Sequence, residues 1–258
     1  MDEWMIILIA GGIVFTTFTV EGIAGFGATV MALPFVAMLI GIDKAVPMLS
    51  SLGVLVSFFI VLRSWRDLDW KEYLFIVLHV GIGVPCGLFM MDFLPKEWLI
   101  AILVCFMFFA GIKGLCGIFR KSSVPRRSPM GKKNLLSRVV LILGGVIQGA
   151  FSSGGPVVVM YAAGALPEKS KFRATLSSLW LTTNTFMVTK WTLSGTVWTP
   201  QLGKMILCSL PFIVAGMVFG DFLHRKVDQR KFTILVYSVL IVAAFMLGGN
   251  LLRNIAAS

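Results

Sequence analysis

The sequence is short of charge. Only 14% of its 258 residues are Asp, Glu, Lys or Arg, whereas 57% are hydrophobic. A soluble domain needs about a quarter of its residues charged to cover its surface. The hydrophobic residues lie in long runs, and about 20 such residues are enough to cross a bilayer as a helix. The composition therefore excludes an ordinary soluble enzyme and predicts a multi-pass membrane protein.

Common catalytic and metal-binding patterns are also missing. The four cysteines show no CxxC spacing, so neither a disulfide framework nor a zinc site is expected. The sequence contains no GxSxG and no HExxH motif. An intramembrane hydrolase with Ser152 or Ser153 as nucleophile would have only His79 and His224 as bases. This hydrolase is the less favoured alternative, and we expect a protein that is not an enzyme and has no cofactor or metal.

Acidic residues are outnumbered by basic ones, 12 against 23, which gives a net charge of +11. The basic residues lie in short loops between apolar runs, where they set the orientation in the membrane, so no nucleic-acid partner is expected. The most basic stretch, 120–134, is predicted to be cytoplasmic. The loops 64–71, 167–171 and 223–231 then fall on the same side. This arrangement places both termini outside, in a protein of the bacterial inner membrane.

Ten apolar segments are expected to form helices. They cover residues 4–20, 28–41, 45–63, 72–91, 97–119, 135–151, 156–166, 172–190, 202–222 and 232–252. The basic stretch separates them into two sets of five. We therefore predict an all-α membrane protein with a first repeat at 1–119, a linker at 120–134 and a second repeat at 135–258.

The two halves resemble each other in sequence. A shift of 127 positions aligns residues 21–52 with 148–179 without a gap, and the glycine-rich interruptions of both halves then coincide. The loop charges require the two halves to have opposite orientations. We therefore predict inverted repeats, each opened by a broken or re-entrant helical hairpin, a design that recurs in secondary transporters.

The paired interruptions are the candidate binding site. Ser152-Ser153-Gly154-Gly155-Pro156 is typical of a helix start, with a serine cap and an early proline. Free N–H groups and the positive end of the helix dipole suit an anion there, whereas the alternative role of such small residues is close helix packing. The predicted substrate-binding residues are Gly25, Phe26, Gly27, Ala28, Ser152, Ser153, Gly154, Gly155 and Asn184.

Glu21 is the only acidic residue between Glu3 and Asp43. An ionisable side chain at membrane depth often has a function, here a coupling proton, but it can also be structural. Both interpretations stay open, because its repeat counterpart Gln148 cannot titrate. The polar run 182–185 either lines the pathway or bonds neighbouring helices. The predicted coupling or pathway residues are Glu21, Gln148, Thr183, Ser51 and Ser178.

Two motifs carry a resemblance to a known family. Gly22-Ile23-Ala24-Gly25-Phe26-Gly27-Ala28, followed by Pro34, and Gly149-Ala150-Phe151-Ser152-Ser153-Gly154-Gly155-Pro156 resemble the sulfite exporter TauE/SafE family, within the toluene-sulfonate-uptake permease group. Chain length, duplicated halves and the basic linker agree, so the resemblance covers essentially the whole chain. It implies transport of sulfite or of organosulfonates such as sulfoacetate.

The expected function is therefore that of a secondary transporter, a permease or exporter of small anions. It would work by alternating access, with the anion held at the helix starts of the two hairpins. A passive anion channel is the alternative within transport. The expected partners are a small anionic substrate, the lipid bilayer and a coupling proton, and a homodimer is compatible with the sequence.

Overall fold

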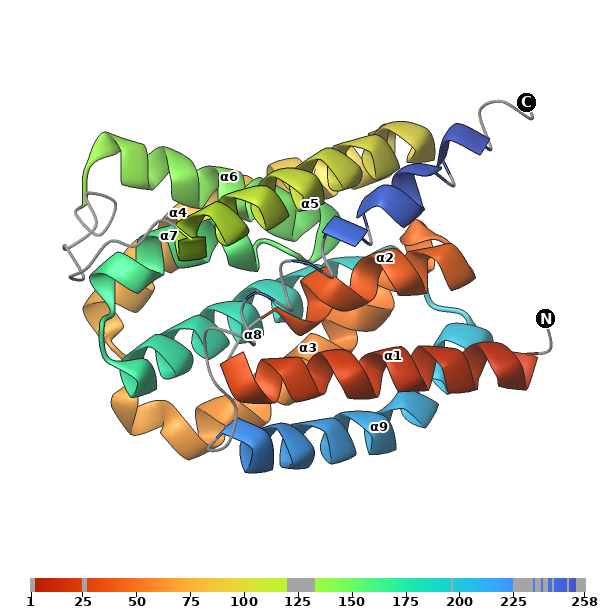
Figure 1. The fold of residues 1–258 in the computed structure, drawn as a ribbon, viewed down its shortest axis with the longest axis horizontal. Helices are drawn as coiled ribbons and strands as arrows, with labels where there is room; N and C mark the ends of the chain where they lie inside the picture. The colour runs from red at the N-terminus through yellow and green to blue at the C-terminus, as the bar shows by residue number, and fades with distance from the viewer. Residues whose placement is uncertain are drawn as a thin grey trace.

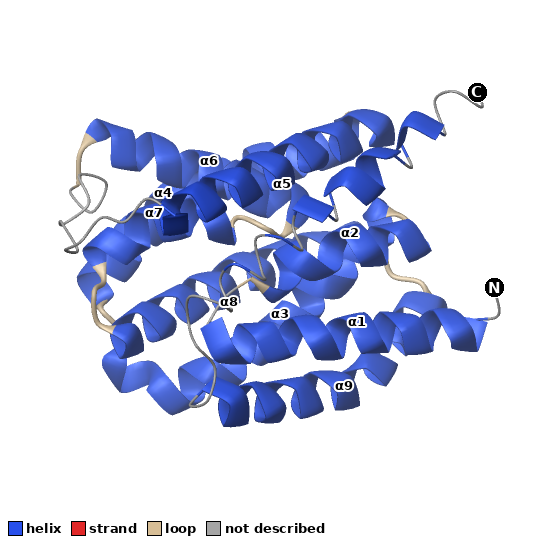
Figure 2. Cartoon of the chain, viewed as in Figure 1, coloured by secondary structure: helices blue, strands red, loops and turns tan. Residues whose placement is uncertain are grey.

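The computed structural model is helical throughout the part of the chain that it describes (Figure 2). The described residues are 3–24, 27–119, 133–195, 197–224, 234, 238, 241–242, 244–249 and 251–253. No strand occurs among them. This confirms the predicted all-α class.

Nine α-helices and one 3-10 turn have defined bounds within the described residues. They are α1 (Glu3–Ala24), α2 (Ala28–Ile40), α3 (Ile42–Ser64), η1 (Trp65–Asp67), α4 (Trp70–Phe93), α5 (Lys96–Phe119), α6 (Leu135–Phe151), α7 (Gly155–Ala165), α8 (Lys169–Ser194) and α9 (Pro200–His224). Each of the first nine predicted segments corresponds to one of these helices. The tenth, 232–252, lies only partly within the described residues, and those residues are helical.

The helices differ in whether they can span a bilayer. Among the described residues, five helices are long and apolar enough: α1, α3, α4, α5 and α9. The helices α2 and α7 have 13 and 11 residues. At 1.5 Å per residue they reach about 20 Å and about 16 Å, which is short of the roughly 30 Å hydrocarbon core. Each therefore forms the short arm of a hairpin, α1–α2 in the first half and α6–α7 in the second. The chain is a polytopic membrane protein.

Special backbone conformations produce the two hairpin breaks. Gly27 precedes α2 with a φ of 102°, a value that glycine adopts far more readily than other residues. Ser152 ends α6 with a φ of 52°, and its N–H donates to the Gln148 carbonyl at 2.7 Å. This is the only non-glycine residue with positive φ in the described chain. The turn back into α7 thus begins with a left-handed residue, a common way to end a helix.

The helices α4 and α6 pack closely through glycines. A Cβ atom at Gly83 would lie 2.1 Å from the Ile142 carbonyl oxygen, and one at Gly87 would lie 2.1 Å from the Val146 carbonyl oxygen. Such distances leave no room for a side chain. Small residues that let backbones approach are typical of helix pairs in membranes.

The helices α1 and α9 repeat this packing. A Cβ atom at Gly216 would lie 2.6 Å from the Phe15 carbonyl oxygen, and one at Gly220 would lie 2.5 Å from the Thr19 carbonyl oxygen. The shift of 127 positions places Phe15 and Thr19 on the two α6 residues that contact α4. The first helix of each half therefore packs on the fourth helix of the other half, in the same register.

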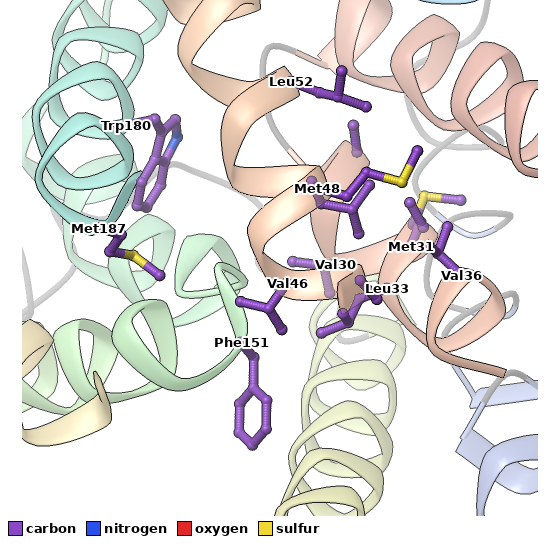
Figure 3. Packing of buried hydrophobic residues seen from close by; sticks show 14 of the residues in the cluster. Val30, Met31, Leu33, Val36, Val46, Met48, Leu52, Phe151, Trp180 and Met187 are labelled. Atoms are coloured by element: carbon purple, nitrogen blue, oxygen red, sulfur yellow. The ribbon is translucent and has the colours of Figure 1, made fainter. Parts of the chain in front are cut away.

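The hydrophobic core extends through the bundle, where α3 packs on both α2 and α8 (Figures 1 and 3). Figure 3 shows side chains of α2 and α3 packing against one another. Phe151 at the end of α6 and two side chains of α8 lie beside them. The labelled residues are Val30, Met31, Leu33, Val36, Val46, Met48, Leu52, Phe151, Trp180 and Met187. The core thus draws on both halves of the chain.

Outside the two hairpins, the described connections between helices lie at the two ends of the bundle (Figure 1). The α3–α4 and α7–α8 connections lie at one end, together with the start of α6 and the end of α9. The α2–α3, α4–α5 and α8–α9 connections lie at the other end. The described parts of the basic loops 64–71 and 167–171 therefore share one end, and the assignment of this end to the cytoplasm stays a prediction.

Candidate functional site

A small cavity with mostly polar lining residues lies between the two hairpins. Six helices or their connections supply its walls, three from each half of the chain. The lining residues are Glu21, Gly27, Thr29, Val30, Gly53, Ser57, Gln148, Ser152, Ser153, Gly155, Trp180 and Asn184. The first turns of α2 and α7 therefore border the same space.

The two halves contribute equivalent positions to this lining. The shift of 127 positions places Glu21 on Gln148 and Ser57 on Asn184, and all four residues line the cavity. Ser57 and Asn184 lie beyond the segment that the sequence comparison aligned. A cavity lined by the same positions of both repeats is what a site between two related halves requires.

In the first half, Glu21 holds the start of α2. Its Oε2 atom accepts a hydrogen bond from the Ala28 N–H at 3.1 Å. The first turn of a helix has N–H groups without an intrahelical acceptor, and this end of the helix dipole is positive. A carboxylate oxygen is therefore well placed at this position. The Glu21 side chain is half-buried beside the cavity.

In the second half, Gln148 accepts a hydrogen bond from the backbone at the start of α7. Its Oε1 atom accepts from the Gly154 N–H at 3.0 Å, and its Nε2 donates to Asn184 Oδ1 at 2.7 Å. The Ser152 hydroxyl donates to the same Asn184 oxygen at 3.1 Å. Both amide side chains are buried, with 2% of Gln148 and 4% of Asn184 exposed. Burial at this depth is tolerated because the polar groups bond one another.

Two glycines make room for the hydrogen bonds around Gln148 and Asn184, because a side chain at either position would clash. A Cβ atom at Gly154 would lie 2.4 Å from the Gly144 carbonyl oxygen. A Cβ atom at Gly53 would lie 2.7 Å from Asn184 Nδ2. Gly53 therefore allows α3 and α8 to approach at the cavity, and Gly154 allows the hairpin to close on α6.

One sequence expectation about the second hairpin is wrong. Serine side chains do not cap α7, because its N-cap residue is Gly154 and the Ser153 hydroxyl donates to the Phe151 carbonyl at 2.9 Å. The amides expected to be open are also partly occupied. Gln148 and Glu21 accept from the Gly154 and Ala28 N–H groups, because each reaches forward along its own hairpin.

The structure brings most of the predicted site residues together. The predicted residues that line the cavity are Glu21, Gly27, Gln148, Ser152, Ser153, Gly155 and Asn184. Ala28 and Gly154 contribute the N–H groups just described. Gly25 and Phe26 lie outside the described residues.

Three predicted pathway residues are not among the lining residues. The hydroxyls of Ser51, Ser178 and Thr183 donate to carbonyls four residues earlier in their own helices, at 2.8, 2.9 and 3.0 Å. Such bonds satisfy a buried hydroxyl within a helix. Their assignment to the pathway stays a prediction.

Sequence reasoning missed five lining residues: Thr29, Val30, Gly53, Ser57 and Trp180. Extending the repeat alignment past residue 52 would have found Ser57, because it coincides with the predicted residue Asn184. The same extension pairs Gly53 with Trp180. The pattern of hydrophobic residues along the chain does not identify any of these five residues as part of the cavity.

The lining limits the chemistry available to the site. Glu21 is the one ionisable side chain in it, and no group of three or more metal-binding side chains gathers within the described residues. His79 does not line the cavity, because its Nδ1 atom bonds the Phe75 carbonyl of its own helix at 2.7 Å. Serine hydroxyls, an asparagine amide and two helix starts can donate hydrogen bonds to a small anion.

Comparison with known proteins identifies the family. The family model described as "Sulfite exporter TauE/SafE" matches residues 8–247, which includes both hairpins and the linker. No curated protein and no solved structure gives a significant match. Because the family match extends over nearly the whole chain, this protein belongs to the TauE/SafE sulfite exporter family, a family of membrane transporters.

Proposed function

We propose that this protein is a secondary transporter of small sulfur anions, sulfite or organosulfonates such as sulfoacetate, in the bacterial inner membrane. Membership of the TauE/SafE family supports transport of sulfur anions. One observation carries the location of the site: the first turns of α2 and α7, from opposite halves of the chain, border a single polar cavity.

No lysine or arginine is among the described lining residues, and the starts of α2 and α7 would supply positive potential at the anion. Arg173 of α8 lies close enough to Glu21 to interact with its charge, and it would add to that potential. The Ser57 hydroxyl and the Asn184 amide group add side-chain donors around the same space. Ser152 and Ser153 could also donate to the anion if they gave up their bonds to Asn184 and to the Phe151 carbonyl. The oxygens of a sulfite or sulfonate group accept several hydrogen bonds at once, which matches this set of converging donors.

Binding would replace hydrogen bonds that the protein already makes. Glu21 and Gln148 accept from the N–H groups at the starts of α2 and α7, where an anion would also bind. An incoming oxygen takes the place of the side-chain oxygen, so the N–H groups stay bonded throughout. The exchange therefore avoids the cost of leaving a buried donor unpaired.

Glu21 is the proposed carrier of the coupling proton. An ionised Glu21 is itself a tethered anion at the start of α2, and it repels a second negative charge nearby. A protonated Glu21 is neutral and resembles Gln148 in charge. Anion binding would therefore be favoured when Glu21 has taken up a proton. The proton and the anion would then cross the membrane together.

Alternating access between inverted repeats is the proposed mechanism. The matching contacts of α4 with α6 and of α9 with α1 support a pseudo-symmetric pair of halves. The described basic loops gather at one end of the bundle, which supports a cytoplasmic linker and extracytoplasmic termini. A rocking of one half against the other would open the cavity to each side in turn.

Thermal stabilisation of the purified protein by anions tests the proposed site. Sulfite and sulfoacetate should raise the melting temperature in a saturable way, and chloride should do so far less. Asn184→Ala should abolish the shift, whereas Thr16→Ala should keep it, because the Thr16 hydroxyl bonds the Gly12 carbonyl away from the cavity. Equal shifts in Asn184→Ala and wild type would show that the anion binds elsewhere.

Transport in proteoliposomes separates the transporter from a passive channel. A coupled transporter should accumulate sulfite against its gradient when a proton gradient is imposed, and the Glu21→Gln variant should not. Equilibration without accumulation in the wild type would instead favour the channel.

A further inference from the structure

A second and larger cavity lies between α5 and α7, and it shares no lining residue with the central site. Its walls are apolar except for one lysine, Lys113 of α5. The α5 residues in it recur every three or four positions, as in Phe106, Phe109, Lys113 and Gly117, so one face of this helix forms one wall. We call this space the α5–α7 groove.

Lys113 has no negative partner within the described residues. Its Nζ atom lies 3.4 Å from Met160 Sδ and 5.5 Å from the centre of the Phe109 ring. Other lysines in the described chain make ion pairs, for example Lys133 with Glu72 and Lys96 with Asp43. A cation on a membrane-facing helix is costly unless it reaches the interface or an anion. The described part of the chain therefore supplies no counter-charge to Lys113.

The position of Lys113 along α5 fits the head-group level of one leaflet. It lies six residues before the end of α5 at Phe119, which is about 9 Å along the helix axis. That end of α5 leads into the basic stretch 120–134. A lysine side chain can extend from this depth to the phosphate level while its methylene groups stay in the apolar groove.

The rest of the groove offers space for a hydrocarbon chain. Ala110, Gly114 and Gly117 of α5 and Ala163 of α7 are small, and they line the groove beside larger apolar side chains. Phe109 is 62% exposed and borders the opening. A cation at one end of an apolar groove on a membrane helix is complementary to an anionic lipid.

We propose that the α5–α7 groove binds an anionic phospholipid, with its phosphate on Lys113 and one acyl chain along α7. A second copy of this chain fits the groove less well. The only acidic residue of α5 is Glu97, at the opposite end of the helix, so a two-fold pairing of this face would leave Lys113 without a counter-charge. The proposal does not depend on which anion the protein transports.

The bound lipid would also contact the short arm of the second hairpin. Pro156 and Val157 line the α5–α7 groove, and the adjacent Gly155 lines the central cavity. An acyl chain in the groove would therefore support α7 from the side opposite to the site. Anionic lipid is expected to stabilise this hairpin by filling the space behind it.

Native mass spectrometry of the purified, delipidated full-length protein tests the proposal. It would be titrated with phosphatidylglycerol and with phosphatidylcholine of identical acyl chains. Phosphatidylglycerol should bind more tightly, and Lys113→Gln should weaken it about fivefold while leaving phosphatidylcholine unchanged. Lys113→Arg, which keeps the charge, should retain binding.

The matched control is Lys204→Gln. Lys204 also lies over an aromatic ring, that of Trp4 at 4.3 Å, but it lies outside the α5–α7 groove. This variant should bind both lipids as the wild type does. Equal affinity of wild type and Lys113→Gln for phosphatidylglycerol would overturn the proposal, as would an equal loss in Lys204→Gln.

A groove-filling variant provides an independent check. A Cβ atom at Gly117 would meet no other atom within 4 Å, so Gly117→Leu should fold while its side chain enters the groove. It should lower the binding of both lipids, because the acyl chain is displaced. If the wild type is a dimer without lipid and Gly117→Leu makes it monomeric while lipid binding persists, the groove is a protein interface and the proposal is wrong.

Discussion

The starts of α2 and α7 both have backbone N–H groups that need an acceptor, and the two hairpins supply chemically different acceptors. At the start of α2 the acceptor is a carboxylate, Glu21, at 3.1 Å from the Ala28 nitrogen. At the start of α7 it is a neutral amide, Gln148, at 3.0 Å from the Gly154 nitrogen. The distances are alike, but only the first acceptor can carry a proton. The bonded N–H groups differ by one position, because the shift of 127 places Ala28 on Gly155 rather than on Gly154. The comparison teaches that matched positions in the two halves supply acceptors of different charge at slightly different points of the helix start.

The hairpins also differ in how they are held. The helix α2 packs along both α1 and α3, and its side chains belong to the central core (Figure 3). The helix α7 packs mainly on α6 and borders the α5–α7 groove. Within α7, the Tyr161 hydroxyl donates a hydrogen bond to the Glu72 carboxylate of α4 at 2.8 Å. Val158 and Ala162 of α7 also belong to the hydrophobic core, so the second hairpin combines packing with this additional polar contact.

The largest effect is expected for Gly154→Leu. Even a Cβ atom would lie 2.4 Å from the Gly144 carbonyl oxygen, so the second hairpin cannot close on α6. Transport of sulfite in proteoliposomes should be lost while the protein still inserts into the membrane. Gly203→Leu is the matched control, because a Cβ atom there meets nothing within 4 Å. Normal transport by Gly154→Leu would remove α7 from the site.

Glu21→Gln should make the two hairpins chemically equivalent. In the wild type, protonation of Glu21 removes a negative charge from the site, so anion binding should strengthen as pH falls. In Glu21→Gln no proton is taken up at this position, and binding should be strong at every pH tested. Calorimetry at several pH values would measure this.

The reciprocal variant Gln148→Glu sharpens the same comparison. It places a second carboxylate in the cavity, so binding should become weaker and more pH-dependent than in the wild type. A pH dependence that persists unchanged in Glu21→Gln would assign the proton to another residue.

Asn184→Ala should cost more stability than Ser57→Ala, although the two residues are repeat counterparts. Asn184 accepts hydrogen bonds from Gln148 and Ser152, and its removal leaves two buried donors unpaired. A cost of about 1 kcal/mol in the free energy of unfolding is expected, within the range for bonds inside membrane proteins. Denaturant unfolding in detergent would measure it, and equal losses for both variants would contradict the proposed asymmetry.

The smallest effect is expected for Tyr161→Phe. It removes the bond to Glu72 but keeps the aromatic contact with Phe75, whose ring centre lies 5.5 Å away. About 0.5–1.5 kcal/mol of stability should be lost. Tyr73→Phe, which removes the 2.7 Å hydroxyl contact with Thr182 on α8, is the control. Hydrogen exchange should increase in α7 after Tyr161→Phe and not after Tyr73→Phe.

The sequence predicted the helices and their breaks well, because both follow from local chemistry. Long apolar runs become helices in a membrane, and glycines such as Gly27 interrupt them where the backbone needs a positive φ. The polar run 182–185 within an apolar segment also led to Asn184 as a site residue. These features depend on residues that are close together along the chain.

The side-chain contacts of the site were not predictable in the same way. That Gln148 accepts from Gly154 depends on how the hairpin folds back, and that it also donates to Asn184 depends on where α8 crosses. Trp180 and Ser57 enter the cavity only because α3 and α8 meet at Gly53. Apolar periodicity fixes which segments are helices, but it does not fix which polar groups meet between distant segments.

Equilibrium binding of labelled sulfite to wild type, Ser57→Ala and Asn184→Ala tests the central claim most directly. Ser57 and Asn184 come from opposite halves of the chain and line one cavity. If both halves form a single site, the wild type binds one sulfite per chain and each variant weakens that same binding event. Two independent sulfite ions per chain, or a site that only one of the two variants affects, would contradict a shared site between the hairpins.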